Sequence, residues 1–128
     1  MDWNLFCCEV LTKGSPSSEY VYLGTTDGTK LGENDRRCGF SRKFTTSDIS
    51  IIINSNGSDF FHADGEYIYL GKEGDFFCHD GETRSMVYGF SSKCILIVCG
   101  SGFITKRVFT DCRQAVEYGI GVLKAKGW

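Results

Sequence analysis

The apolar positions near the end of the chain change their spacing at a glycine turn. Residues 93–99 form a short run rich in β-branched side chains, which is typical of a buried strand. Gly100-Ser101-Gly102 interrupts this run, and after Thr105 the apolar residues recur at intervals of three and four. The pattern predicts a core strand, a tight turn and a long helix that packs on a sheet. Its apolar face comprises Val108, Phe109, Cys112, Ala115, Val116, Gly119, Ile120 and Leu123.

The beginning of the chain also has helical spacing, which predicts a first helix over residues 2–12. Asp2 places a negative charge where it favours a helix N-terminus, and a lysine followed by Gly14 is a usual helix end. Trp3 and Phe6 then lie one turn apart on the same face. The apolar positions of this helix are Trp3, Phe6, Cys7, Val10 and Leu11.

The segment between the first helix and residue 59 predicts a hairpin and a second helix. Residues 19–24 alternate, so the tyrosines and the aliphatic residues point to opposite faces of a strand. Asp27-Gly28 is a hairpin turn signal, and residues 29–33 form the return strand. Thr46-Ser47-Asp48 offers capping oxygens for a short helix that contains Ile49, Ile52 and Ile53, although Ile51 does not fit its apolar face.

From residue 59 onward the pattern is a meander of short strands. These runs cover residues 59–62, 66–70, 75–79, 84–91 and 93–99. The turns between them are Asp64-Gly65, Gly71-Lys72-Glu73-Gly74 and Asp80-Gly81-Glu82. Short strands joined by such turns pair consecutively and antiparallel. The sequence therefore predicts one α+β domain over residues 1–128, with a central antiparallel sheet and the N- and C-terminal helices packed on one face.

Composition excludes several classes of function. The net charge of −2 gives no basis for nucleic-acid binding, and no apolar run reaches the length of a membrane span. The seven cysteines are an odd number, with no export signal before them, which indicates free thiols in the reducing cytosol. The chain lacks a Cys-x-x-Cys pair, so neither a metal nor another cofactor is expected.

Catalytic motifs are also missing. The segment from Gly100 to Arg107 follows a strand and opens a helix, but it has neither the phosphate-loop nor the dinucleotide pattern. Cys78 and His79 are adjacent in a strand and therefore point to opposite faces, so they cannot act as nucleophile and base. We therefore expect a binding protein and not an enzyme. Four basic residues between positions 34 and 43 form either an anion-binding patch or, as we favour, a solvated loop.

Two segments at opposite ends of the chain resemble the profilin family. Met1-Asp2-Trp3-Asn4-Leu5-Phe6 is similar to the Trp-x-x-Tyr/Phe with which profilins open. Residues 93–100, followed by Val108-Phe109-Thr110-Asp111-Cys112-Arg113, resemble the last strand and C-terminal helix of the family. The order of elements is similar along nearly the whole chain. The resemblance implies a monomeric, cytoplasmic protein of the cytoskeleton that binds monomeric actin on one side and proline-rich proteins such as formins on the other.

The proline-rich site that the resemblance implies lies between the terminal helices. A polyproline II segment is preformed and has no amide donors, so aromatic walls with a few donors suit it. Leu31 stands where profilins commonly have a third aromatic residue, and Gly119 replaces a larger residue, which predicts weak or selective binding. The residues implied for this site are Trp3, Phe6, Tyr118 and Trp128.

The actin side that the resemblance implies involves the later strands and the start of the last helix. Its candidate residues are Phe60, Lys72, Phe103, Lys106, Arg107 and Thr110. Phosphoinositide binding, another activity of the family, needs a basic surface. The basic pairs Arg36-Arg37, Arg42-Lys43 and Lys106-Arg107 could supply one.

Two other classes fit the predicted architecture. One is an adaptor scaffold like the longin or roadblock proteins, which would bind a protein partner without affinity for actin or polyproline. The other is a small enzyme that uses one of its cysteines, which requires a thiol with a lowered pKa. Actin titration and selective thiol alkylation distinguish these classes.

Overall fold

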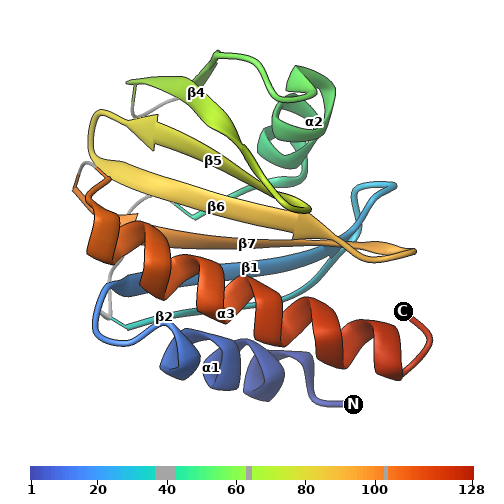
Figure 1. Ribbon diagram of the computed structural model, residues 1–128. Helices are drawn as coiled ribbons and strands as arrows, with labels where there is room; N and C mark the ends of the chain where they lie inside the picture. The colour runs from blue at the N-terminus through green and yellow to red at the C-terminus, as the bar shows by residue number, and fades with distance from the viewer. Residues whose placement is uncertain (37–42, 63–64, 103) are drawn as a thin grey trace.

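Seven antiparallel strands form one sheet in the computed structural model, which describes residues 1–36, 43–62, 65–102 and 104–128 (Figure 1). The helices are α1 (Trp3–Lys13), α2 (Thr46–Ser55) and α3 (Lys106–Ala125). The strands are β1 (Ser18–Thr25), β2 (Lys30–Asp35), β3 (Phe60–His62), β4 (Gly65–Glu73), β5 (Phe76–Gly81), β6 (Arg84–Phe90) and β7 (Cys94–Ser101). Their order in the sheet is β2-β1-β7-β6-β5-β4-β3. The predicted α+β fold with a central antiparallel sheet is confirmed.

Inside the sheet, β1 pairs with β7, and these two strands come from opposite ends of the chain. Val21 lies opposite Val98, and Leu23 lies opposite Leu96. The predicted alternation in β1 is confirmed, because Val21 and Leu23 belong to one core cluster while the tyrosines at positions 20 and 22 belong to another. The sheet thus separates two cores.

The terminal helices share one face of the sheet, as the sequence predicts (Figure 1). Asp2 caps α1 by accepting hydrogen bonds from the amides of Asn4 and Leu5, and Thr105 caps α3 through the amide of Val108. The helices approach closely at Gly119 of α3. The core between them and the sheet includes Phe6, Cys7, Val10, Leu11, Val21, Leu23, Val87, Leu96, Val98, Cys112, Ala115, Val116, Ile120 and Leu123.

Helix α2 contributes to the core on the opposite face. Thr45 and Asp48 form a reciprocal capping box at its start. Ile49 and Ile52 are buried, whereas Ile51 is 40 % exposed, which explains why Ile51 interrupts the apolar pattern. This second core is rich in aromatic residues and contains Tyr20, Tyr22, Phe44, Ile49, Ile52, Phe60, Tyr67, Met86, Tyr88, Ile95, Ile97 and Cys99.

The structure corrects three of the predicted turns. Of the predicted Gly100-Ser101-Gly102 turn, the first two residues belong to β7, which continues through Ser101. Gly71-Lys72-Glu73 belongs to β4, and the turn itself is confined to Gly74 and Asp75. The register of β4 shifts between Tyr69 and Gly71, and Gly71 has a φ of 138°, so its glycine serves an irregularity within a strand. Strand β5 likewise continues through Gly81 before it turns. Of the predicted Asp64-Gly65 turn, Asp64 lies outside the described residues.

Part of the helix-bearing face of the sheet has no helix on it. Helix α3 lies mainly over β6 and β7, and α1 lies over β1 and β2, whereas β4 and β5 extend beyond both helices (Figure 1). Ile68 and Leu70 of β4 are therefore exposed on this face, whereas Cys78 of β5, which is nearer to α3, is buried. Within the described residues, no helix has both the length and the apolar character needed to cross a membrane.

Candidate functional site

Three of the aromatic residues assigned to the proline-rich site lie together where α1 begins and α3 ends. The Trp3 ring meets the Trp128 ring edge to face, with 5.1 Å between centroids, and lies 6.2 Å from Phe6. Trp3 and Trp128 are only partly buried, whereas Phe6 is 4 % exposed. The two tryptophans thus offer accessible aromatic surface, and Phe6 supports them from the core.

The position of Trp128 is fixed by the turn between β6 and β7. Its carbonyl oxygen accepts hydrogen bonds from the Lys93 amide at 2.8 Å and from Ser91 Oγ at 2.9 Å. Its own amide donates to the carbonyl oxygen of Leu123, and Lys93 Nζ lies 5.3 Å from its ring. These contacts hold the indole against Trp3, so Trp128 is part of an ordered wall.

Beside this cluster, the seam between α1 and α3 contains a hollow of about 240 Å³. Its lining residues are Met1, Asp2, Leu5, Phe6, Glu9, Val122 and Lys126. Leu5 is 58 % exposed at the rim of this hollow. Leu5 and Val122 were missed by sequence reasoning, because Leu5 falls outside the apolar face that buries α1.

Tyr118 does not join the tryptophans. Its hydroxyl lies 3.4 Å from Glu9 Oε2, and Lys13 Nζ lies over its ring at 4.9 Å. Leu31 stands at the position where profilins commonly have a third aromatic residue. Its side chain is partly buried and packs against the core. The accessible aromatic surface is therefore that of Trp3 and Trp128.

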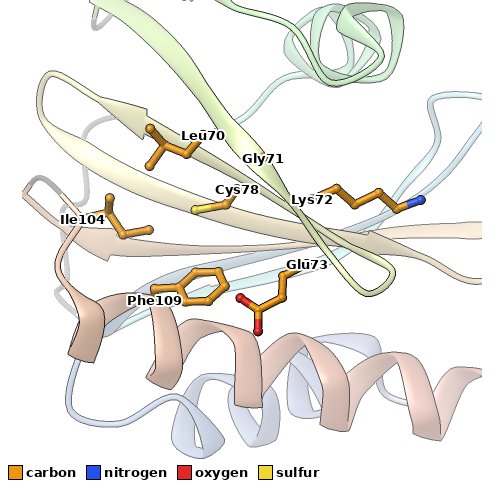
Figure 2. A pocket seen from close by; sticks show the side chains of 7 residues that line it. All are labelled: Leu70, Gly71, Lys72, Glu73, Cys78, Ile104 and Phe109. Atoms are coloured by element: carbon orange, nitrogen blue, oxygen red, sulfur yellow. The ribbon is translucent and has the colours of Figure 1, made fainter.

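The uncovered strands and the start of α3 enclose another hollow, which we call the β4–α3 hollow. Its volume is about 390 Å³, and its lining residues are Leu70, Gly71, Lys72, Glu73, Cys78, Ile104 and Phe109. Figure 2 shows Leu70, Cys78, Ile104 and Phe109 gathered around its centre, with the Lys72 ammonium directed away from it. The centre is thus apolar and the rim is charged.

Several charged side chains surround this hollow. Arg113 of α3 lies 3.4 Å from Glu73 and links the helix to β4. Lys106 and Arg107 are exposed in the first turn of α3, where Arg107 Nε is 3.8 Å from Asp111. Thr110, also exposed, donates to the carbonyl oxygen of Lys106. Lysine and arginine at a helix N-terminus are electrostatically unfavourable, so a partner's negative charge suits this position.

Three further candidates for the actin side are Phe60, Lys72 and Phe103. Phe60 is 8 % exposed and stacks on Tyr67, with ring centroids 5.1 Å apart and planes at 5°. Its side chain belongs to the second core, whereas the following residue, Phe61, is 70 % exposed on the opposite face. Phe103 lies outside the described residues. Lys72 lies in β4 rather than in the predicted turn, and its Nζ is 5.2 Å from the Phe77 ring centroid.

Sequence reasoning missed the apolar centre of the β4–α3 hollow. Leu70 is 52 % exposed because it lies at the register shift of β4, beyond the reach of α3. Ile104 is held by a hydrogen bond from its amide to Asp80 Oδ1 at 2.9 Å. Phe109 lies on the predicted apolar face of α3 but only partly contacts the core, because the helix leaves the sheet there.

Arg36, the first basic residue of the predicted basic loop, has a structural role. The Arg36 guanidinium donates to the carbonyl oxygens of Ser18 and Leu11 and to Ser15 Oγ, so it braces the connection between α1 and β1. Lys43 lies 3.8 Å from Asp35. Arg37 and Arg42 lie outside the described residues. The phosphoinositide hypothesis therefore stays a prediction.

Four of the described thiols, those of Cys7, Cys78, Cys94 and Cys112, do not resemble catalytic nucleophiles. Burial raises the pKa of Cys7 and of Cys78 to about 12, and it also raises the pKa of Cys94 and Cys112. A raised pKa lowers the fraction of reactive thiolate at neutral pH. Across the ranges that the structure describes, no three His, Cys, Asp or Glu side chains are arranged to hold a metal ion.

Comparison with known proteins supports the fold through structure alone. No family model and no curated sequence matches this chain. Acanthamoeba castellanii profilin IB superposes with a TM-score of 0.68 and 14 % identity, covering 94 % of this chain and 98 % of that one. Mouse profilin IIa, in complex with a double repeat from the FH1 domain of mDia1, gives 0.70 and 11 %, covering 100 % of both chains.

A different group of structures is also similar. Myxococcus xanthus MglB superposes with a TM-score of 0.56 and 13 % identity, covering 95 % of this chain and 87 % of that one. The profilin scores are higher, and the coverage is nearly complete in both directions. The fold of this chain is therefore profilin-like.

Proposed function

We propose that this chain is a cytoplasmic, monomeric, non-enzymatic protein that binds actin monomers and regulates their polymerisation. The observation that supports this proposal most is the β4–α3 hollow. It lies on the uncovered part of a profilin-like sheet, beside the first turn of α3 where Lys106, Arg107 and Thr110 are exposed. An actin monomer bound here would be blocked at one end and could add only to the fast-growing end of a filament.

The composition of this surface suits a protein partner. Stable interfaces combine a desolvated apolar centre with a polar rim. Leu70, Ile104 and Phe109 supply the centre. Lys72 and Glu73 line the rim, and Lys106 and Arg107 are exposed in the adjoining first turn of α3. Charges at a rim mainly increase the association rate and the selectivity of binding, so charge reversal at these two positions is a direct test.

We further propose a second site for proline-rich segments at the Trp3–Trp128 wall. Edge-to-face tryptophans with the adjoining hollow between α1 and α3 provide the flat apolar surface and indole donors that a polyproline II segment requires. The FH1 repeat bound to mouse profilin IIa supports a proline-rich ligand for this fold. Because Phe6 is buried and position 31 is leucine, we expect weak binding.

The actin proposal is tested with pyrene-actin. The protein should suppress spontaneous nucleation in a dose-dependent manner, and the double variant Lys106→Glu/Arg107→Glu should weaken this suppression. The matched control is Lys124→Glu/Lys126→Glu, which changes the net charge equally at the far end of the same helix. If the two double variants behave alike, Lys106 and Arg107 have no part in the contact. If the wild-type protein has no effect at tens of micromolar, the actin function is wrong.

The proline-rich site is tested separately by titration with a decaproline peptide. Trp3→Ala and Trp128→Ala should each abolish measurable binding and leave the effect on pyrene-actin unchanged. Phe61→Ala is the control, since Phe61 is exposed far from the terminal helices. Loss of both activities in a folded Trp3→Ala protein would show that the two sites are wrongly separated.

The alternative is an adaptor scaffold like the longin or roadblock proteins. It predicts no response in either titration and a partner bound through a sheet edge or a helix. Sedimentation of the purified protein adds a further test, because we expect a monomer whereas self-association through an edge strand would favour the scaffold.

A further inference from the structure

The uncovered part of the sheet carries another hollow where β3, β4 and β5 meet, which we call the β3–β5 hollow. Its volume is about 440 Å³, and its lining residues are Phe61, Glu66, Ile68, Asp80, Gly81 and Glu82. Phe61 pairs with Glu66 in the register of β3 and β4, and Ile68 pairs with Asp80 in that of β4 and β5. Residues opposite each other point to the same face, so these four side chains share one surface.

Large apolar side chains are exposed on this surface. Phe61 is 70 % exposed and Ile68 is 39 % exposed, and Leu70 at 52 % lies next along β4 toward the β4–α3 hollow. A single exposed apolar residue is common in proteins. Several exposed apolar side chains on neighbouring strands, one of them an aromatic ring, instead indicate a binding surface. The β-strand register, and not chance scatter, brings this group together.

The polar side chains around these residues are all acidic. Asp80 accepts a hydrogen bond from the Ile104 amide, and Glu82 accepts one from the Glu66 amide at 2.7 Å. These backbone donors hold two of the carboxylates at the hollow. Across the described ranges, no lysine, arginine or histidine forms an ion pair with Glu66, Asp80 or Glu82. The surface is therefore apolar at its centre and negative around it.

We propose that the β3–β5 hollow is a docking site for a basic segment of a partner protein, in which lysine or arginine residues flank an apolar side chain. The apolar side chain covers Phe61 and Ile68, and the flanking cations meet the carboxylates. The inference goes beyond the proposed function, because the charge here is opposite to that of Lys106 and Arg107 and none of the residues assigned to actin or to proline-rich segments lines this hollow. Nucleic acids and anionic membranes are excluded as occupants by charge.

The probe is the synthetic peptide Lys-Val-Lys-Phe-Lys-Val-Lys, added to ¹⁵N-labelled protein. We expect chemical-shift changes at the amides of residues 61, 66, 68, 80 and 82 and an affinity that falls as salt concentration rises. A peptide with glutamate in place of lysine should cause no shifts, and one with serine in place of valine and phenylalanine should bind much more weakly. No shift at these amides up to millimolar peptide, or equal binding of the serine peptide, overturns the proposal.

Variants of the protein complete the test. Glu66→Gln/Glu82→Gln removes two charges and keeps an oxygen to accept the hydrogen bond at position 82, and it should weaken binding about fivefold, as expected for two exposed charge pairs. Phe61→Ser should weaken it at least as much while far-UV circular dichroism stays unchanged. Asp75→Asn/Glu117→Gln is the matched control, with two exposed carboxylates elsewhere. If the control weakens binding equally, the peptide responds only to net charge and the proposal is wrong.

Discussion

Gly119 is where α3 crosses α1 and β7, and replacing it by alanine tests that crossing. A Cβ at position 119 would overlap Leu96 Cδ2 and lie 3.0 Å from Val10 Cγ2 and 3.5 Å from Phe6 Cζ. Alanine in a helix interior is favoured over glycine by about 1 kcal/mol, whereas an extra methyl in a packed core costs about 1–3 kcal/mol. Since Leu96 and Val10 are fully buried and have little room to move, we expect a net destabilisation of about 1 kcal/mol.

Gly121, two residues later on the same helix, provides the opposite case. A Cβ there meets no atom within 4 Å, so Gly121→Ala should stabilise the protein by up to about 1 kcal/mol. Urea unfolding measures both changes in the free energy of unfolding, provided that the m-value stays constant. The melting temperature should fall by about 4 °C in Gly119→Ala and rise by about 4 °C in Gly121→Ala. If Gly119→Ala stabilised the protein as much as Gly121→Ala, the close crossing of the helices would be refuted, together with the position of Phe6 that depends on it.

Three further predictions concern the cores and the thiols. Phe60→Ala should lower the free energy of unfolding by about 3–4 kcal/mol, whereas Phe61→Ala should change it by less than about 0.5 kcal/mol; urea unfolding of the two variants checks the assignment of their faces. His79 Nε2 lies 3.0 Å from the Ser58 carbonyl oxygen, and burial lowers the pKa of this histidine. As the pH falls, the unfolded chain therefore takes up a proton at His79 near pH 6.5, and the folded protein does so only at lower pH. The stability that neutral His79 contributes is therefore complete above about pH 6.5 and declines below it; a His79→Gln variant with the same decline in urea titrations from pH 7.5 to 5 would contradict this. Iodoacetamide at pH 7 followed by peptide mass mapping should label the exposed Cys8 well before the buried Cys78, and equal rates would show that Cys78 is not protected.

The elements at the two ends of the chain were predictable because each has one dominant periodicity. In residues 108–123 the apolar side chains recur at intervals of three and four, which predicts a helix. In residues 19–24 tyrosines alternate with aliphatic side chains, which predicts a strand. The second helix was also predicted, from the capping oxygens of Thr46-Ser47-Asp48, although the residue that caps it in the structure is Thr45. The end of β4 was not predicted correctly. A glycine at an irregularity within a strand, such as Gly71, cannot be distinguished by its local sequence from a glycine in a turn, such as Gly74.

The candidate surfaces were less predictable than the fold. In the run Phe60-Phe61-His62, the spacing shows that the two phenylalanines point to opposite faces but not which face is covered, and the actin-side candidate was the buried one. That choice depends on how far α3 extends across the sheet, which is a tertiary property. The wall at Trp3 and Trp128 likewise depends on the hydrogen bonds that Ser91 and Lys93 make, which no local pattern indicates.

The pairing of β1 with β7 has a consequence for how the chain acquires its structure. Every contact in this ladder joins residues from the first fifth of the chain to residues from its last third, so the entropic cost of closing a long loop falls on the step that completes the sheet. Until residues 94–101 have been synthesised, β1 has only β2 beside it. The backbone edge of β1 that later pairs with β7 is then free to pair with other chains, and the apolar side chains of Val21 and Leu23 are uncovered. We therefore expect slow, high-contact-order folding, and aggregation of nascent or truncated chains that end before β7.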